Sequence, residues 1–492
     1  MYMNHFSKLR LSFYVALIFV SIPIFAAKTS IKNVYRYTLP NGLELFVMEN
    51  NASPLAYIEI AVRAGGVTQT PETAGLFHLY EHMMFKGNEK YQNQAAVQAA
   101  LTKMGISNWN GSTGVDRINY YFTVPSSQLQ QGLEFWSYAI RTPRLDAQEL
   151  ENEKSVVLSE ITADETDPAH IFSSALARQL YAESPWQLDP SGAPSTVKNA
   201  TEQTLRDIQN KYYVPNNAAL FVGGAVRHKE VYKLVKQIFG SWKKGKAISA
   251  IAVPSKEPFT TTSAQRKNYF VYADPRSSGN YLQAALYSPG PDGESDLQDT
   301  YAADVWTGLL SNPGGFFSTS LVQDNALHIP DPDYVGGYYF TRRAAGIISL
   351  SAAMLCTQEP VEQAEHFFNK LSEFCTTDFS DTKTFLTSDA LERTKQQKAD
   401  KQIYAQESVS ALLSELSSVW AACGADYFFT YAKQFEKVQA SDVQSFVARY
   451  LTNKIGMAAV FISPELYETH KDAFSKAGYQ LITSENAFWW KN

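Results

Sequence analysis

Residues 75–87 read GLFHLYEHMMFKG, and this stretch decides how the rest of the chain is interpreted. Upstream, Thr70-Pro71-Glu72 is typical of a helix start, and the closing glycine of the stretch is typical of a helix end. The stretch is therefore predicted to lie in the middle of a helix. At about 100° per residue, His78 and His82 share one helix face, and Glu81 lies on the same side.

Two imidazoles at positions i and i+4 can bind one Zn²⁺, each at about 2.0–2.1 Å. The glutamate between them can take a proton from a water molecule activated by the metal and pass it to a leaving amine. His-x-x-Glu-His is the inverzincin order, the reverse of the commoner zincin motif. The alternative is a pair of surface histidines with a solvated glutamate. The apolar neighbours of the motif favour the metal site, because buried ionisable groups need partners.

A catalytic zinc site usually has three protein ligands, so one more is needed. Residues 145–161, LDAQELENEKSVVLSEI, predict a helix that starts near Asp146. Glu149, Glu153 and Glu160 fall close to one face of it. Glu160 is flanked by apolar residues and is expected to be the buried acid and the third ligand. Glu153 is expected to support the site, with a solvated helix charge as the alternative.

These motifs together resemble the pitrilysin/insulinase family of zinc metallopeptidases. Glu160 follows His82 by 78 residues within ENEKSVVLSEI. Further stretches resemble landmarks of the family, namely Leu39-Pro40-Asn41-Gly42-Leu43, Asn110-Gly111-Ser112-Thr113 with Asp116 and Tyr120, Tyr213-Val214-Pro215-Asn216-Asn217, and Gly223. The resemblance covers residues 33–245 well and the second half loosely.

The resemblance implies an α+β fold of two similar domains, each a mostly antiparallel β-sheet with helices packed on one face, around a chamber that admits peptides. It implies one zinc ion per chain, held by His78, His82 and Glu160. Glu81 becomes the general base and Glu153 a second acid of the catalytic site. Asn110 sits just before a strand-like stretch, residues 112–124. The resemblance implies an edge strand there that pairs with extended substrate near Asn110, Gly111 and Ser112, where the alternative is a simple turn. Main-chain pairing of this kind gives sequence-tolerant affinity.

The second half departs from the family pattern. Residues 312–321, NPGGFFSTSL, resemble a segment that precedes an Arg and a Tyr, which polarise the scissile carbonyl in complete single-chain members. Residues 322–328 contain neither. Tyr338, Tyr339, Arg342 and Arg343 lie downstream as weak substitutes. Loss of such a donor costs about 10²–10³ in rate. Some bacterial members pair an active subunit with a metal-less subunit that supplies the donors. The expected partners are therefore peptide substrates and either a second copy of this chain in a homodimer or a metal-less family subunit in a heterodimer.

The chain organisation follows from length and periodicity. A total of 492 residues predicts more than one domain. Residues 204–222 and 442–460 show the same helix-then-strand pattern. The N-terminus has Lys8 and Arg10, then an apolar run and two alanines, which predicts a signal peptide over 1–26, with an uncleaved anchor as the alternative. The expected domains are 27–245 and 263–492, joined by a linker at 246–262, in a periplasmic or secreted protein with no membrane segment after cleavage.

Composition excludes several classes. Forty-three basic and 49 acidic residues give a net charge of −6, which argues against a nucleic-acid partner. Three cysteines exclude a disulfide framework and a four-thiolate zinc site. The remaining histidines in the predicted mature chain lack partners at ligand spacing and are interpreted as ordinary residues, namely His170, His228, His328, His366 and His470.

Two functions remain open from the sequence. The first is a zinc endopeptidase that cuts peptides or unstructured polypeptide segments outside the cytoplasm. The second is a non-catalytic subunit with a structural or binding role in a peptidase-like complex. The complete set of His78, Glu81, His82 and Glu160 favours the enzyme.

Overall fold

The structure is a computed structural model that describes residues 31–491 except 32, 107, 183, 249–267, 313, 345, 357–358, 377–384 and 455. The predicted signal peptide and most of the predicted linker lie outside the described residues, so the domain limits stay a prediction. No helix in the described part of the chain combines the length and the apolar character that crossing a membrane requires.

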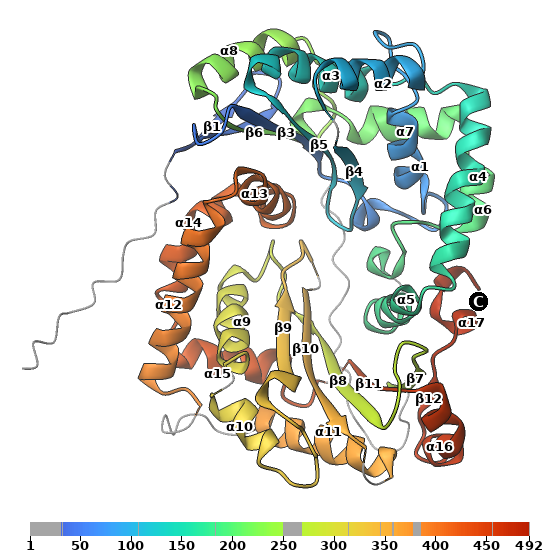
Figure 1. Cartoon of the computed structure of the whole chain (residues 1–492), viewed down its shortest axis with the longest axis vertical. Helices are drawn as coiled ribbons and strands as arrows, with labels where there is room; N and C mark the ends of the chain where they lie inside the picture. Colours follow the sequence, from blue (N-terminus) through green and yellow to red (C-terminus); the bar gives the residue numbers. More distant parts are fainter. Residues whose placement is uncertain are drawn as a thin grey trace, which may run out of the picture.

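Two six-stranded sheets form the framework, one in each half of the chain (Figure 1). The first has the order β1-β2-β6-β3-β5-β4 and the second the order β12-β7-β11-β8-β10-β9. In each sheet, most neighbouring strands are antiparallel. The strands are β1 Val34–Thr38, β2 Glu44–Glu49, β3 Leu55–Val62, β4 Trp109–Thr113, β5 Ile118–Pro125, β6 Ala218–Gly224, β7 Tyr269–Ala273, β8 Tyr281–Gly290, β9 Val335–Phe340, β10 Gly346–Leu355, β11 Met457–Ile462 and β12 Gln480–Leu481.

Helices follow the strands in a similar order in both halves. In the first half they are α1 Leu76–Met84, α2 Gln94–Lys103, α3 Leu129–Arg141, α4 Ala147–Asp164, α5 Pro168–Leu180, α6 Pro194–Lys198, α7 Glu202–Tyr212 and α8 His228–Phe239. In the second half they are α9 Leu297–Leu310, α10 Phe316–Val322, α11 Pro360–Thr376, α12 Ser388–Ala405, α13 Val409–Cys423, α14 Ala425–Phe435, α15 Ala440–Tyr450, α16 Pro464–Lys476 and α17 Ser484–Ala487. The predicted α+β fold of two similar domains is therefore confirmed.

The helix-then-strand similarity found in the sequence is a repeated structural unit. Helix α7 leads into β6, and α15 leads into β11, with both strands buried at every position. The stretch Leu39–Leu43 noted in the sequence connects the antiparallel pair β1–β2, in which Thr38 lies opposite Glu44. The two halves thus follow one folding plan.

The sheets are covered on both faces, and one layer on each comes from the other half. In β2, Leu45 and Val47 face the first half's own helices, while Phe46 and Met48 face α13. The second sheet is covered in the same way by α5 of the first half, through Leu176 and the aromatic ring of Phe172. Successive side chains of a strand point to opposite faces, so strands covered on both sides are apolar at nearly every position. Figure 1 shows α13 beneath the first sheet and α5 beside the second.

A buried carboxylate fastens α13 to the first sheet. Glu59 in β3 is fully buried, and its Oε1 accepts hydrogen bonds from Arg117 at 3.0 Å, Asn119 at 2.9 Å and Ser417 of α13 at 2.6 Å. Its Oε2 accepts one from Tyr57 at 2.7 Å. A buried charge is tolerated when it is paired and hydrogen-bonded in this way.

Candidate metal centre

The helix that carries the motif begins later than the sequence predicts. Residues 71–75 form turns, and α1 starts at Leu76, so the expected start at Thr70–Glu72 is wrong. Gly75 has φ +90°, and a Cβ there would lie 2.8 Å from the Cα of Gly192. This close crossing of two backbones fixes the helix start and puts His78 in the first turn rather than in the middle.

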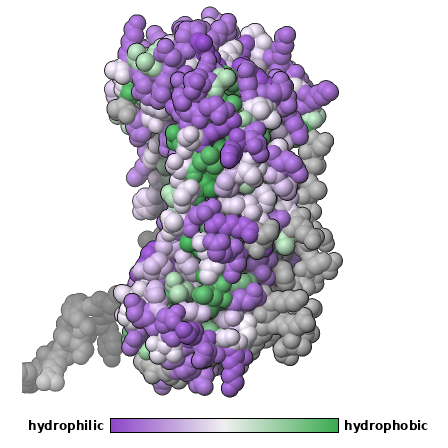
Figure 2. All heavy atoms as spheres, turned by 90° about the vertical axis from the view of Figure 1, so that its right-hand side faces the viewer, coloured by the Kyte–Doolittle hydropathy of each residue, from purple (hydrophilic) through white to green (hydrophobic). Residues whose placement is uncertain are grey.

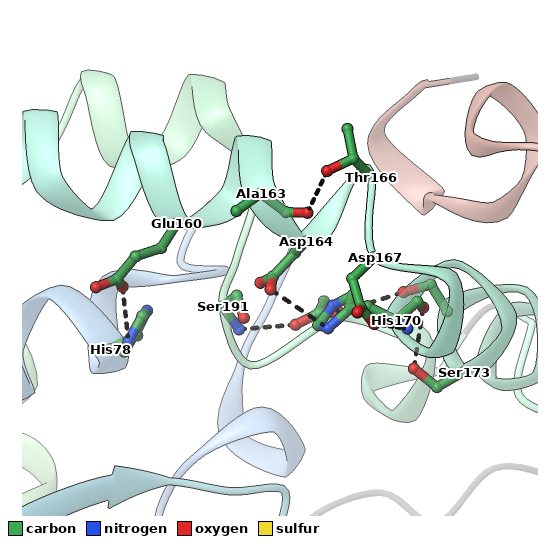
Figure 3. Close-up of polar contacts among 11 residues, drawn as sticks. His78, Glu160, Ala163, Asp164, Thr166, Asp167, His170, Ser173 and Ser191 are labelled. Carbon is green, nitrogen blue, oxygen red and sulfur yellow. Dashed lines mark hydrogen bonds and ion pairs between the residues drawn. The ribbon is translucent and has the colours of Figure 1, made fainter. Parts of the chain in front are cut away.

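Three side chains named from the sequence come together at metal-ligand spacing. Oε2 of Glu160 lies 3.6 Å from Nε2 of His78 and 3.5 Å from Nε2 of His82. Figure 3 shows Glu160 of α4 pointing at His78 of α1. All three donor atoms lie within 4.8 Å of one another. Two bonds of about 2.0–2.1 Å at a tetrahedral angle would separate donors by about 3.3–3.4 Å, so this donor set fits zinc.

The two acids of α4 have opposite exposures from those expected. Glu160 was expected to be the buried one, yet its side chain is 46% exposed, while that of Glu153 is 7% exposed. The apolar residues beside Glu160, Val157 and Ile161, point into the core, and the carboxylate between them points away from it. The face of the molecule that includes α4 is largely hydrophilic, with a narrow apolar strip (Figure 2).

Glu153 binds the side of His82 that faces away from Glu160. Nδ1 of His82 donates to Oε2 of Glu153 at 3.0 Å, and Nζ of Lys86 lies 2.5 Å from Oε1. Burial raises the pKa of Glu153, but the hydrogen bonds from His82 and Lys86 outweigh it and lower that pKa. Burial likewise lowers the pKa of His82, but Glu153 and the other nearby carboxylates outweigh it and raise that pKa. This contact leaves Nε2 of His82 free to bind a metal.

His78 is held as a neutral imidazole. Burial, and then the neighbouring His82, lower its pKa to about 4. A neutral ring is the form that binds a metal ion. Its Nε2 faces Glu160, while its Nδ1 is buried on the opposite side of the ring.

Glu81 lies between the metal group and strand β4. Oγ1 of Thr113 donates to its Oε2 at 2.6 Å. A Cβ on Gly111 would lie 2.7 Å from its Oε1, so only glycine fits there without displacement. Burial raises the pKa of Glu81 and Glu160 adds to this, while Thr113 and His82 oppose it. A carboxylate with a raised pKa is closer to the range in which a general base works at neutral pH.

The strand expected near Asn110 is an edge strand with a different extent. The stretch 112–124 was expected to be continuous, but residues 114–117 divide it into the hairpin β4–β5, and Asn110 lies inside β4. Among the described strands, β4 pairs with β5 alone. Asn110 and Ser112 are exposed, and Oδ1 of Asn110 accepts from the backbone N–H of Gly111 at 3.0 Å.

A cavity of about 680 Å³ adjoins this hairpin between the two halves of the chain, and its lining includes Ser112 and Arg342. Two of the other residues considered as substitute donors are engaged elsewhere. Tyr339 donates to the backbone oxygen of Pro291 at 2.9 Å, and Arg343 pairs with Glu294 at 3.1 Å. Tyr338 is 48% exposed on β9.

Two functional contacts escaped the sequence reasoning. Lys86 is four residues after His82 and so shares its helix face, which was a usable signal. Thr113 could not be found in the same way, because its contact with Glu81 depends on how the hairpin packs against α1. None of the three cysteines, all of which lie in the described part of the chain, forms a disulfide, and Cys356 and Cys375 are buried.

Comparison with known proteins agrees with this geometry. Residues 45–189 match the family model described as insulinase (peptidase family M16), and residues 199–398 match the model of the peptidase M16 inactive domain. The chain is 26% identical over 202 residues to a probable mitochondrial-processing peptidase subunit beta of Arabidopsis thaliana, covering 41% of this chain and 38% of that protein. It is 28% identical over 236 residues to the uncharacterized zinc protease YmxG of Bacillus subtilis, covering 48% of this chain and 56% of that protein.

The chain thus spans about half the length of these curated relatives, or less. The first half of the periplasmic protease PqqL from Escherichia coli has the same fold, with a TM-score of 0.70 at 18% identity, over 92% of this chain and 97% of that one. The second family model begins at residue 199, within the first half, and continues into the second half, so the two models together reach strands of both sheets. The chain belongs to the M16 (insulinase) family of peptidases.

Proposed function

We propose that this chain is a zinc-dependent endopeptidase that hydrolyses peptides or unstructured polypeptide segments. The observation that carries the proposal is the convergence of His78, His82 and Glu160 at ligand spacing, with the half-buried Glu81 beside them. A structural subunit would have no need of this combination. Zinc bound by these residues would lower the pKa of a water molecule to about 7 and polarise the scissile carbonyl.

Glu81 is the general base of the proposed reaction. Its raised pKa suits it to accept a proton from the attacking water and then to deliver it to the leaving amine. The hydrogen bond from Thr113 fixes the position of the carboxylate. Glu153 holds the ring of His82 through Nδ1, so that its Nε2 faces Glu160. Such supporting partners typically account for 10–100-fold in metal affinity or activity.

Substrate would bind as an additional strand on β4. Its free edge offers main-chain donors and acceptors to an extended peptide. Gly111, in the middle of β4, touches Glu81, so a peptide paired there would pass close to the base. Asn110 and Ser112, on the exposed side of the strand, would contact the substrate backbone.

A partner subunit would complete the site. Residues 322–328 lack the Arg and Tyr that the family uses at this place, and of the downstream substitutes Tyr339 and Arg343 are already engaged. The plant relative is itself named a subunit. We therefore infer that this chain is the metal-bearing member of a dimer with a metal-less partner. Robust peptide turnover by the purified protein alone would refute this.

The predicted leader would direct the protein out of the cytoplasm. One structural neighbour is named a periplasmic protease, which supports a periplasmic location. Fractionation of cells that produce the full chain, with N-terminal sequencing of the product, would test both the location and cleavage near Ala26.

The deciding experiment compares wild type with Glu81→Gln. The variant keeps all three metal ligands, so zinc content should stay at one ion per chain while cleavage of an unstructured peptide falls by about 10²–10⁴-fold. The experiment is run with the natural partner present, isolated by co-purification from cells that produce the chain. Unchanged cleavage would remove Glu81 from its role, and insensitivity to chelators would refute the zinc mechanism.

A further inference from the structure

His170 makes two acidic contacts close to the metal group. It lies in the first turn of α5, just after α4 ends, and its ring uses both nitrogens. Nε2 lies 2.5 Å from Oδ2 of Asp189, and Nδ1 lies 3.6 Å from Oδ1 of Asp164. Figure 3 shows Asp164 of α4 pointing toward this ring, in the same view as His78 and Glu160.

The contact with Asp164 connects His170 to α4, the helix that carries the third metal ligand. Asp164 follows Glu160 by four residues on α4, so both carboxylates lie on one face, one helical turn apart. Movement of the end of α4 away from His170 would carry Glu160 with it. This contact is made by a side chain that is 30% exposed, so solvent reaches it.

The contact with Asp189 connects His170 to the loop beside the start of α1, the helix that carries both histidine ligands. Asp189 also accepts from the backbone N–H of Ser191 at 2.8 Å, which shapes the loop through Gly192. That loop lies against Gly75, immediately before α1. The side chain of Gln69 ties the same elements together, because it donates to the backbone oxygen of Asp189 at 3.1 Å and accepts from the backbone N–H of Gly75 at 2.6 Å.

The ring of His170 is itself fixed by the end of the chain. Phe488 is fully buried and stacks on it, with ring centroids 6.1 Å apart and planes 19° from parallel. Lys491, three residues later, pairs with Glu165 at the end of α4 at 2.9 Å. The acids around the ring are Asp164, Asp167 and Asp189, and the hydrogen bond to Asp189 raises the pKa of His170.

We propose that His170 is a positioning residue of the metal centre. It ties the helix of Glu160 to the loop that supports the helix of His78 and His82, and so holds the three donor atoms at ligand spacing. This inference rests on the proposed zinc site. It assigns a role to a residue outside the ligand set and outside the His-x-x-Glu-His motif.

The test is the zinc affinity of His170→Gln, measured by competition with a chromogenic chelator on the full chain. Glutamine cannot reach both carboxylates, so the dissociation constant should rise about 10–100-fold. The visible spectrum of the Co²⁺-substituted variant should also change, because the geometry of the ligands relaxes. The matched control is His470→Gln, which removes a histidine paired with Glu359 at 3.0 Å in the second half.

The outcomes separate the two proposals. Wild-type zinc affinity and an unaltered Co²⁺ spectrum in His170→Gln would overturn the positioning role alone, as would an equal loss in His470→Gln. Failure of the wild-type chain to bind zinc would overturn the zinc site and this inference together. If His170→Gln does not fold, Asp164→Asn is the test, because it removes only the partly exposed contact between Asp164 and His170. A rise in its zinc dissociation constant supports the positioning role, and an unchanged value refutes it.

Discussion

The contact between Gly111 and Glu81 leads to a quantitative prediction for Gly111→Ala. The new Cβ would lie 2.7 Å from Oε1, 3.0 Å from Cγ and 3.1 Å from Cδ of Glu81. Non-bonded carbon atoms rest at about 3.5–4.0 Å, so the carboxylate must retreat by roughly 0.5–1 Å. Strand β4 cannot move away freely, because it pairs with β5 from Trp109 through Thr113.

Displacement by this amount is costly for catalysis. A shift of about 1 Å in a reacting group costs about 10²-fold in rate, which corresponds to about 2.7 kcal/mol of activation free energy. The retreat also lengthens and weakens the hydrogen bond from Thr113, which is 2.6 Å long in the wild type. We expect kcat to fall by about 10²-fold, while zinc content and the thermal unfolding midpoint stay at the wild-type values.

Peptide cleavage kinetics and zinc analysis measure this effect. The matched control is Gly336→Ala in β9, the edge strand of the second sheet, where a Cβ would meet nothing within 4 Å. A double variant with Glu81→Asp adds a second check, because the shorter acid should accommodate the methyl group and the two losses should not add. Wild-type kcat in Gly111→Ala, or a loss confined to KM, would refute the reasoning.

Three further predictions follow from contacts already described. Thr113→Val removes a hydrogen bond that lowers the pKa of Glu81, so the acid limb of the kcat/KM profile should move to higher pH; an unmoved limb would contradict this. Arg117→Met leaves the fully buried Glu59 without its cation and should cost about 3–5 kcal/mol in denaturant unfolding; a loss below 1 kcal/mol would show that the pair is not needed. Glu153 has a lowered pKa, so its contribution to stability is present above the unfolded value of about 4.3 and is lost as pH falls through the folded pKa. Thermal unfolding of metal-free Glu153→Gln should therefore depend less on pH below about 4 than that of the wild type, and parallel curves would refute this.

The sequence predicted which three side chains come together, because most of that geometry is local. His78 and His82 are one helical turn apart, so their alignment needs only a helix. Glu160 required a second helix, and the apolar pattern of residues 145–161 supplied it. The distances of 3.5–3.6 Å from Glu160 to the two histidines depend on how the two helices pack. The family resemblance, and not local spacing, led to that expectation.

The errors concern features that depend on distant parts of the chain. Exposure of Glu160 and burial of Glu153 depend on which side of α4 meets the core, and neighbouring apolar residues do not decide that. The late start of α1 depends on the contact between Gly75 and Gly192, which lie far apart in the sequence. The break at residues 114–117 turned one expected strand into two, because the hairpin turn lacks a strong turn signature beyond Gly114.

Helix α13 of the second half covers the first sheet, and α5 of the first half covers the second sheet. This arrangement has a consequence for the order in which the chain can fold during synthesis. The first sheet cannot bury Phe46 and Phe221 until α13 has been synthesised. At about 5–20 residues per second, the stretch from Gly224 to Val409 takes roughly 10–40 s to make. Throughout that time the nascent first half exposes an apolar sheet surface, which is a natural binding site for chaperones. If the chain is exported as proposed above, this delay would keep it unfolded until α13 has been made.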